Sequence, residues 1–131
     1  SDYYTGFHLD PVILYDRWEF DYKDLILKLR NAIKPEKVKW ISIGLLRFPF
    51  QLKNIISDNH PETDIIYKEL IRTDEGKMRY FIKLRLKAYN YLLSVIDKHF
   101  PSSMKYLCME TSYVINKVMK KSSSAEFTVF E

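Results

Sequence analysis

The chain has 131 residues, of which 47% are hydrophobic and 29% are charged, and its formal net charge is +4. This length suits one domain with an apolar core, and the few glycines (3) and prolines (5) argue against a disordered or collagen-like chain. The single cysteine excludes a disulfide scaffold and an all-cysteine metal site within one copy of the chain. No apolar run is long enough to span a bilayer and no signal peptide is visible, so we expect a cytoplasmic protein without a membrane partner.

The N-terminal part predicts a strand followed by an amphipathic helix. Residues 6–14 are mostly apolar and predict a buried strand that Pro11 interrupts, because proline cannot donate to a central ladder. From residue 16 onward, apolar side chains recur at spacings of three and four, and we expect Asp16 to cap the resulting helix. The face predicted to be buried carries Trp18, Tyr22, Leu25, Leu29 and Ile33.

The middle of the chain predicts a second strand, a short helix and a β-hairpin. Residues 38–46 indicate a mostly buried strand, and Pro49 marks the expected start of the short helix. Two β-prone runs, 65–71 and 78–82, flank a polar turn that contains Gly76. This pattern is typical of a hairpin.

The last third predicts a helix, a strand and a further helix. The helix is marked by apolar residues from Leu86 to Phe100, the strand covers 106–109, and the final helix covers 114–119. The predicted order is therefore β-α-β-α-hairpin-α-β-α, which favours an α/β fold with mostly parallel strands and one hairpin. These units are too few to close a barrel, and we expect residues 122–131 to form a flexible tail.

One strand carries two ionisable residues that are candidates for ligand binding. His8 and Asp10 lie two positions apart, so both side chains point to the same face of the strand. A polar cleft at the carboxyl end of the strand would use them in this way. Equally, they could bond each other or a neighbouring loop. Beyond this pair, the sequence contains no glycine-rich phosphate loop and no metal-ligand spacing, and it predicts neither a catalytic set nor a metal site.

The predicted hairpin carries a surplus of basic residues. Arg72, Lys77, Arg79 and Tyr80 would place cations and an aromatic ring on a projecting element. Nucleic-acid binding uses this combination, because cations pair with phosphates and aromatic rings stack on bases. The other interpretation is a solvated, charged edge that prevents aggregation.

Several ordered blocks of this sequence resemble the C-terminal part of spore photoproduct lyase and related radical S-adenosylmethionine (AdoMet) DNA repair proteins. The blocks run from Gly6 to Val12, from Trp40 to Phe48, from Gly76 to Phe81 and from Tyr106 to Glu110. The resemblance implies a partial (β/α) barrel of which residues 1–121 form the C-terminal half. It also implies that the complete protein uses AdoMet and a four-iron four-sulfur cluster, held by a three-cysteine loop, to repair pyrimidine lesions in DNA.

The resemblance also implies what this chain does not carry. An iron–sulfur cluster needs thiolate ligands, and Cys108 is the one cysteine in the chain. We therefore expect a fragment without cofactor that is inactive alone, with His8 and Asp10 on the AdoMet side. Its expected partners are DNA, for the complete protein, and either the missing N-terminal half or a second copy. The alternative is a stand-alone nucleic-acid-binding or self-assembling α/β module that uses the basic hairpin 65–82.

Overall fold

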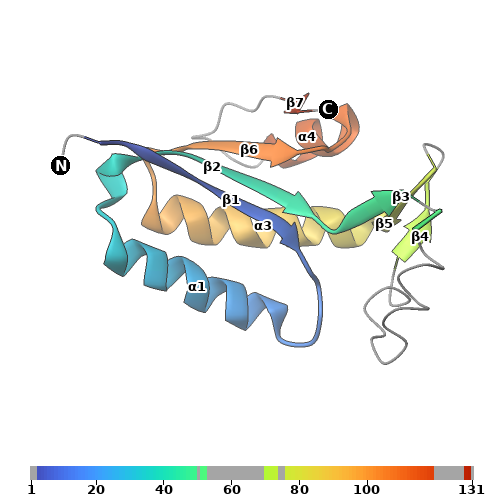
Figure 1. Cartoon of the computed structure of the whole chain (residues 1–131), viewed down its shortest axis with the longest axis horizontal. Helices are drawn as coiled ribbons and strands as arrows, with labels where there is room; N and C mark the ends of the chain where they lie inside the picture. The colour runs from blue at the N-terminus through green and yellow to red at the C-terminus, as the bar shows by residue number, and fades with distance from the viewer. Residues whose placement is uncertain (1–2, 50, 53–69, 74–75, 120–128, 131) are drawn as a thin grey trace.

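The computed structural model describes residues 3–49, 51–52, 70–73, 76–119 and 129–130. Its main sheet has four parallel strands in the order β1-β2-β6-β7 (Figure 1). These strands are β1 (Thr5–Val12), β2 (Val38–Leu45), β6 (Met104–Cys108) and the two-residue β7 (Val129–Phe130). The α/β class with mostly parallel strands is therefore confirmed.

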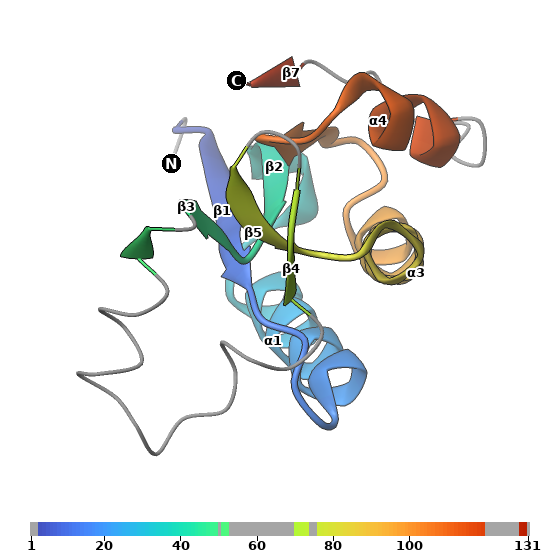
Figure 2. The same cartoon turned by 90° about the vertical axis from the view of Figure 1, so that its right-hand side faces the viewer.

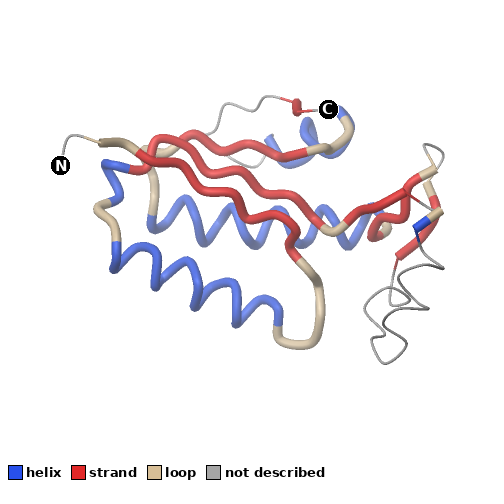
Figure 3. The backbone as a smooth tube through the Cα atoms, in the orientation of Figure 1, coloured by secondary structure: helices blue, strands red, loops and turns tan. Residues whose placement is uncertain are grey.

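The helices α1 (Trp18–Ala32), α3 (Ile82–His99) and α4 (Ser112–Met119) lie on one side of the main sheet (Figure 2). Figure 3 shows α1 and α3 running alongside the strands. A single turn of 3-10 helix, Pro35–Lys37, leads into β2. Within the described part of the chain, no helix covers the opposite face. Parallel sheets are usually covered on both faces, so the helix-free face is the first place to look for a site. The core lies between the sheet and the helices and includes Leu9, Ile41, Ile43, Leu107, Leu92 and Ile96.

A small antiparallel sheet continues from the carboxyl end of β2, with strand order β3-β5-β4. It comprises β3 (Arg47–Pro49), β4 (Leu70–Arg72) and β5 (Lys77–Tyr80). The pairing of β4 with β5 confirms the predicted hairpin at its turn end, where Gly76 has a φ of 78°, whereas residues 65–69 of the predicted first strand lie outside the described residues. The third strand was not predicted. Because β3 pairs with β5, Pro49 ends a strand instead of opening a helix, and the rest of the predicted short helix falls mostly outside the described residues.

The start of α1 differs from the prediction. Arg17, not Asp16, precedes the first helical residue, and it adopts a left-handed conformation with a φ of 69° and no side-chain capping bond. The rotation of the helix also differs, because Ile26 is 1% exposed whereas Leu25 is 40% exposed. The indole of Trp18 meets the ring of Tyr91 on α3 edge-on, with ring centroids 5.5 Å apart, and this contact orients the helix against its neighbour.

The predicted long helix and the strand after it are confirmed as α3 and β6. Lys105 of β6 is fully buried and bonds the end of α3. Its Nζ lies 2.9 Å from the carbonyl oxygen of Phe100 and 2.9 Å from a carboxylate oxygen of Asp97. The ammonium group thus neutralises the carbonyl end of α3, as a cation does at a helix C-terminus. No helix in the described ranges is long and apolar enough to cross a membrane.

Candidate functional site

The helix-free face of the main sheet carries the polar side chains of the three long strands. The register of β1 with β2 aligns His8 with Ser42, and that of β2 with β6 aligns Ser42 with Tyr106. Because side chains alternate between the two faces of a strand, this row lies opposite the apolar core. The sequence therefore predicted the shared face of His8 and Asp10 correctly.

A pocket of about 430 Å³, the sheet-face pocket, opens on this face. The imidazole Nδ1 of His8 hydrogen-bonds the hydroxyl of Ser42, and its ring meets the indole of Trp40 with centroids 4.7 Å apart. A Cβ atom added at Gly6 would lie 2.0 Å from the Trp40 ring, so the missing side chain lets the indole lie against β1. The pocket thus combines aromatic surface with an imidazole and hydroxyl groups; its lining residues are His8, Trp40, Ser42, Tyr106 and Cys108.

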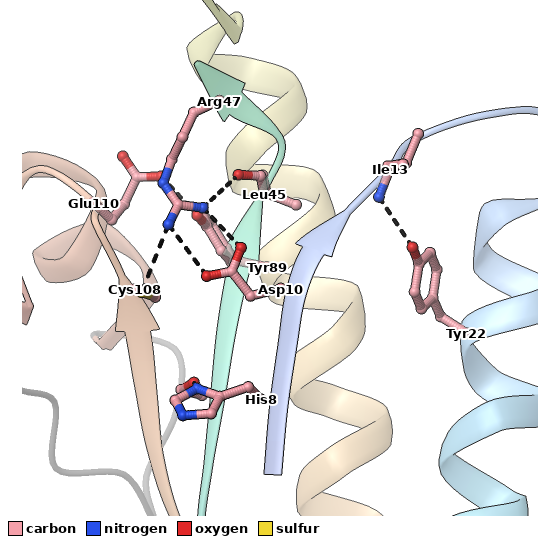
Figure 4. Close-up of polar contacts among 10 residues, drawn as sticks. His8, Asp10, Ile13, Tyr22, Leu45, Arg47, Tyr89, Cys108 and Glu110 are labelled. Carbon is pink, nitrogen blue, oxygen red and sulfur yellow. Dashed lines mark hydrogen bonds and ion pairs between the residues drawn. The ribbon is translucent and has the colours of Figure 1, made fainter. Parts of the chain in front are cut away.

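Asp10 does not contact His8 but pairs with Arg47, which follows β2 (Figure 4). The two guanidinium nitrogens lie 2.9 and 3.2 Å from the two carboxylate oxygens, a bidentate arrangement. Gly44 makes room for this pair, because a Cβ atom there would lie 2.6–2.8 Å from the carboxyl group of Asp10. Burial disfavours the charge on Arg47, but the hydrogen bonds and charge of Asp10 outweigh it and raise the pKa of Arg47.

A second pocket of about 360 Å³ lies beside the Asp10–Arg47 pair, which lines it together with Lys77 of the hairpin. On the other side of the pair, Arg47 reaches the Cys108 thiol of the first pocket, with Nη2 3.7 Å from Sγ. Burial raises the pKa of the Cys108 thiol, Asp10 raises it further, and Arg47 opposes this rise. Arg47, which the sequence did not single out, therefore stands between the two pockets.

The structure changes the interpretation of the basic hairpin. Arg79 is 4% exposed and Tyr80 is 1% exposed, so the expected display of this pair on a projecting surface is wrong. The phenol oxygen of Tyr80 instead accepts a hydrogen bond of 3.0 Å from the backbone N–H of Leu14, which anchors the loop after β1. Of the other two candidates, Arg72 is exposed and Lys77 is partly exposed.

A buried cluster of Glu110, Arg85 and Tyr89 follows the carboxyl end of β6 and links it to α3. The carboxylate of Glu110 accepts hydrogen bonds from the Arg85 guanidinium and the Tyr89 phenol, both on α3. Met109, at a φ of 56°, turns the chain so that Glu110 enters the core. Burial, reinforced by Glu110, raises the pKa of Tyr89 well above its usual value. The two hydrogen bonds tie the chain after β6 to α3 and so fix the end of the strand.

The described residues contain no group of three or more His, Cys, Asp or Glu side chains placed to hold a metal ion. Cys108 forms no disulfide and is half-buried. The polar residues of the sheet face are therefore suited to hydrogen bonding and to contacts with aromatic rings.

Comparisons with known proteins agree on one family. A family model described as spore photoproduct lyase matches residues 1–108. A solved structure, a spore photoproduct lyase double mutant with bound AdoMet and dinucleoside spore photoproduct, matches with a TM-score of 0.60 at 20% sequence identity. The match covers 76% of this chain and 32% of that one, so this chain spans about a third of the length of the matched protein. A search of curated proteins gave no match.

Proposed function

The chain belongs to the spore photoproduct lyase family, and from this premise we propose that it forms the C-terminal part of an AdoMet-dependent lyase domain of the DNA pyrimidine-lesion repair class. One observation carries the proposal: the helix-free face of a parallel sheet holds an open pocket lined by aromatic rings, an imidazole and hydroxyls. The matched structure supports the fold on which this face is built.

The residues present suit AdoMet as a ligand of the 430 Å³ pocket. Trp40 and Tyr106 offer ring surface to an adenine, because aromatic side chains stack on nucleobases. His8 and Ser42 offer hydrogen-bonding groups to ribose hydroxyls. Asp10, held by Arg47, lies near the pocket at the end of the strand and offers carboxylate oxygens as hydrogen-bond acceptors to the polar end of the ligand. When bound in this family, AdoMet is the source of a radical.

The four-iron four-sulfur cluster that the family implies does not fit this chain. Such clusters are held by several cysteine thiolates, and the chain has one cysteine. Cys108 points into the sheet-face pocket and contacts Arg47. We therefore propose that the cluster is held by another segment or chain and that this chain has no lyase activity alone.

The substrate and partners belong to the same proposal. A DNA pyrimidine lesion is the substrate class, and the rest of the family domain is the expected protein partner. The alternative, a stand-alone nucleic-acid-binding or self-assembling module, loses part of its basis because Arg79 and Tyr80 are buried. The other two candidates, Arg72 and Lys77, lie at the surface of the described part of the hairpin, where Arg72 is exposed and Lys77 partly exposed.

The chain contains two tryptophans, which makes tryptophan fluorescence a direct test of AdoMet binding. Trp40 lines the pocket, whereas Trp18 is 6% exposed in the core. We expect AdoMet to quench the fluorescence saturably, Trp18→Phe to retain the quenching and Trp40→Phe to abolish it. Quenching that does not saturate, or that persists in Trp40→Phe, would refute AdoMet binding at this pocket.

A second experiment tests the catalytic part of the proposal. The chain alone and the chain fused to a three-cysteine segment of the family are reconstituted anaerobically with iron and sulfide, and cleavage of AdoMet is measured. We expect cleavage by the fusion and none by the chain alone. Cleavage by the chain alone would contradict the assignment of the cluster to another segment.

A further inference from the structure

Arg47 lies where the ends of three parallel strands meet. Its guanidinium bonds Asp10 of β1, the carbonyl oxygen of Leu45 at the end of β2, and the thiol of Cys108 at the end of β6. The residue thus spans the sheet from its edge strand to its third strand, at the carboxyl ends where α/β proteins place their ligands.

We propose that Arg47 is a positioning residue for the sheet-face pocket: its planar guanidinium fixes the Asp10 carboxylate and the Cys108 thiol relative to each other. The identity of the pocket's ligand rests on the function proposed above. The contacts that define the role of Arg47 do not depend on that function, so the two proposals can be tested separately.

The geometry accounts for every hydrogen on the two terminal guanidinium nitrogens. Nη1 donates to Asp10 at 2.9 Å and to the Leu45 carbonyl at 2.9 Å. Nη2 donates to Asp10 at 3.2 Å and to the Cys108 sulfur at 3.7 Å. Each of these nitrogens carries two hydrogens, so both are fully used. A lysine could keep the charge, but its single ammonium could not reproduce this planar fork.

The surroundings of this pair distinguish it from an ordinary surface ion pair. The side chains of Arg47 and Asp10 are 17% and 22% exposed, whereas those of the Lys28–Asp24 pair on α1 are 74% and 54% exposed. Gly44 leaves the space that the Asp10 carboxylate occupies. Arg47 also lines the second pocket and contacts Cys108, which lines the first, so its loss would remove a charge that lies beside both.

The thiol of Cys108 reports on this arrangement. Asp10 and Arg47 act on its pKa in opposite directions, with Asp10 raising it and Arg47 lowering it. His8 and Tyr106 share the pocket with the thiol, and the buried Glu110–Arg85 pair lies beyond the end of β6. Since the chain has no other cysteine, alkylation by iodoacetamide measures this one thiol.

The test is the pH profile of alkylation of the full chain and four variants. We expect Asp10→Asn to shift the midpoint to lower pH, because the raising carboxylate is lost. Arg47→Met should shift it to higher pH, and Arg47→Lys should shift it in the same direction because charge alone does not hold Asp10 in place. The matched control, Lys28→Met, removes a cation from the exposed α1 pair and should leave the midpoint unchanged.

A double variant separates positioning from simple charge. In the Asp10→Asn background, Arg47 has lost the carboxylate that orients it, so Arg47→Met should produce a smaller shift than in the parent chain. Unchanged midpoints in both Arg47 variants would overturn the proposal, as would full retention of the parent profile by Arg47→Lys. Should Arg47→Met not fold, the isosteric Asp10→Asn and the charged Arg47→Lys still decide the outcome. AdoMet is not needed in this assay, so its failure to bind would count against the proposed function alone.

Discussion

Replacing Gly44 with alanine tests the site through its steric complementarity. In a strand, glycine is less favourable than alanine by about 0.5–1 kcal/mol, so the substitution would stabilise the chain if the added methyl group had space. The structure predicts the opposite sign. The new Cβ would lie 2.6 Å from the carboxyl carbon of Asp10, whose short side chain is held by Arg47 and cannot move away freely.

The expected magnitude follows from these opposing effects. Overpacking of this kind costs about 1–3 kcal/mol, so after subtraction of the strand gain the net destabilisation is about 0–2.5 kcal/mol, with a central value of about 1 kcal/mol. Urea unfolding of the parent chain and of Gly44→Ala measures the difference. The pH profile of Cys108 alkylation should also change, because Asp10 is displaced from the thiol.

A second substitution shows whether the clash is with Asp10. In an Asp10→Ala background the carboxyl group is absent, so Gly44→Ala should become neutral or stabilising. Gly6→Ala serves as a comparison, since its Cβ would meet the Trp40 ring and should destabilise the chain with or without Asp10. If Gly44→Ala destabilises the chain equally in both backgrounds, the destabilisation does not come from a clash with Asp10 and the prediction is refuted.

Three further predictions concern residues outside the pocket. Tyr80→Phe should lower the free energy of unfolding by about 0.5–1.5 kcal/mol in urea titrations, because the half-buried Leu14 amide loses its acceptor. Glu110→Gln should destabilise the chain strongly in the same assay, by about 3–5 kcal/mol, because a buried guanidinium loses its counter-charge. The hydrogen bond to Asp21 raises the pKa of Tyr15 to about 12. The contribution of this hydrogen bond to stability is therefore complete below pH 10 and is lost as the pH rises toward 12. Asp21→Asn should lower the pKa of Tyr15 in a spectroscopic titration.

The strand pattern was predictable because it depends on local alternation. His8 and Asp10 are two residues apart, and a period of two places them on one face in any strand. Arg47 was not predictable in this way. Its partners Asp10 and Cys108 are 37 and 61 positions away in sequence, and only the order of the strands brings them together.

The hairpin shows a second limit of local patterns. Its two strands and its turn could be inferred from residue types, but the exposure of Arg79 could not. Exposure depends on what packs beside β5, and the third strand β3 pairs with it through Arg47 and Arg79. For α1, the spacing of apolar residues allowed either Leu25 or Ile26 to face the core, and the packing against α3 selected Ile26.

The polar groups of the helix-free face also limit what can cover it. His8 already bonds Ser42, and Asp10 already bonds Arg47, so these groups do not require a protein layer to satisfy them. The lining of the pocket also includes the rings of Trp40 and Tyr106. An apolar protein layer would gain little by desolvating paired ions, whereas a ligand with a flat ring and polar substituents can stack on the rings and reach the pairs at their edges. The face is therefore better suited to a nucleoside-like ligand than to a continuous protein interface.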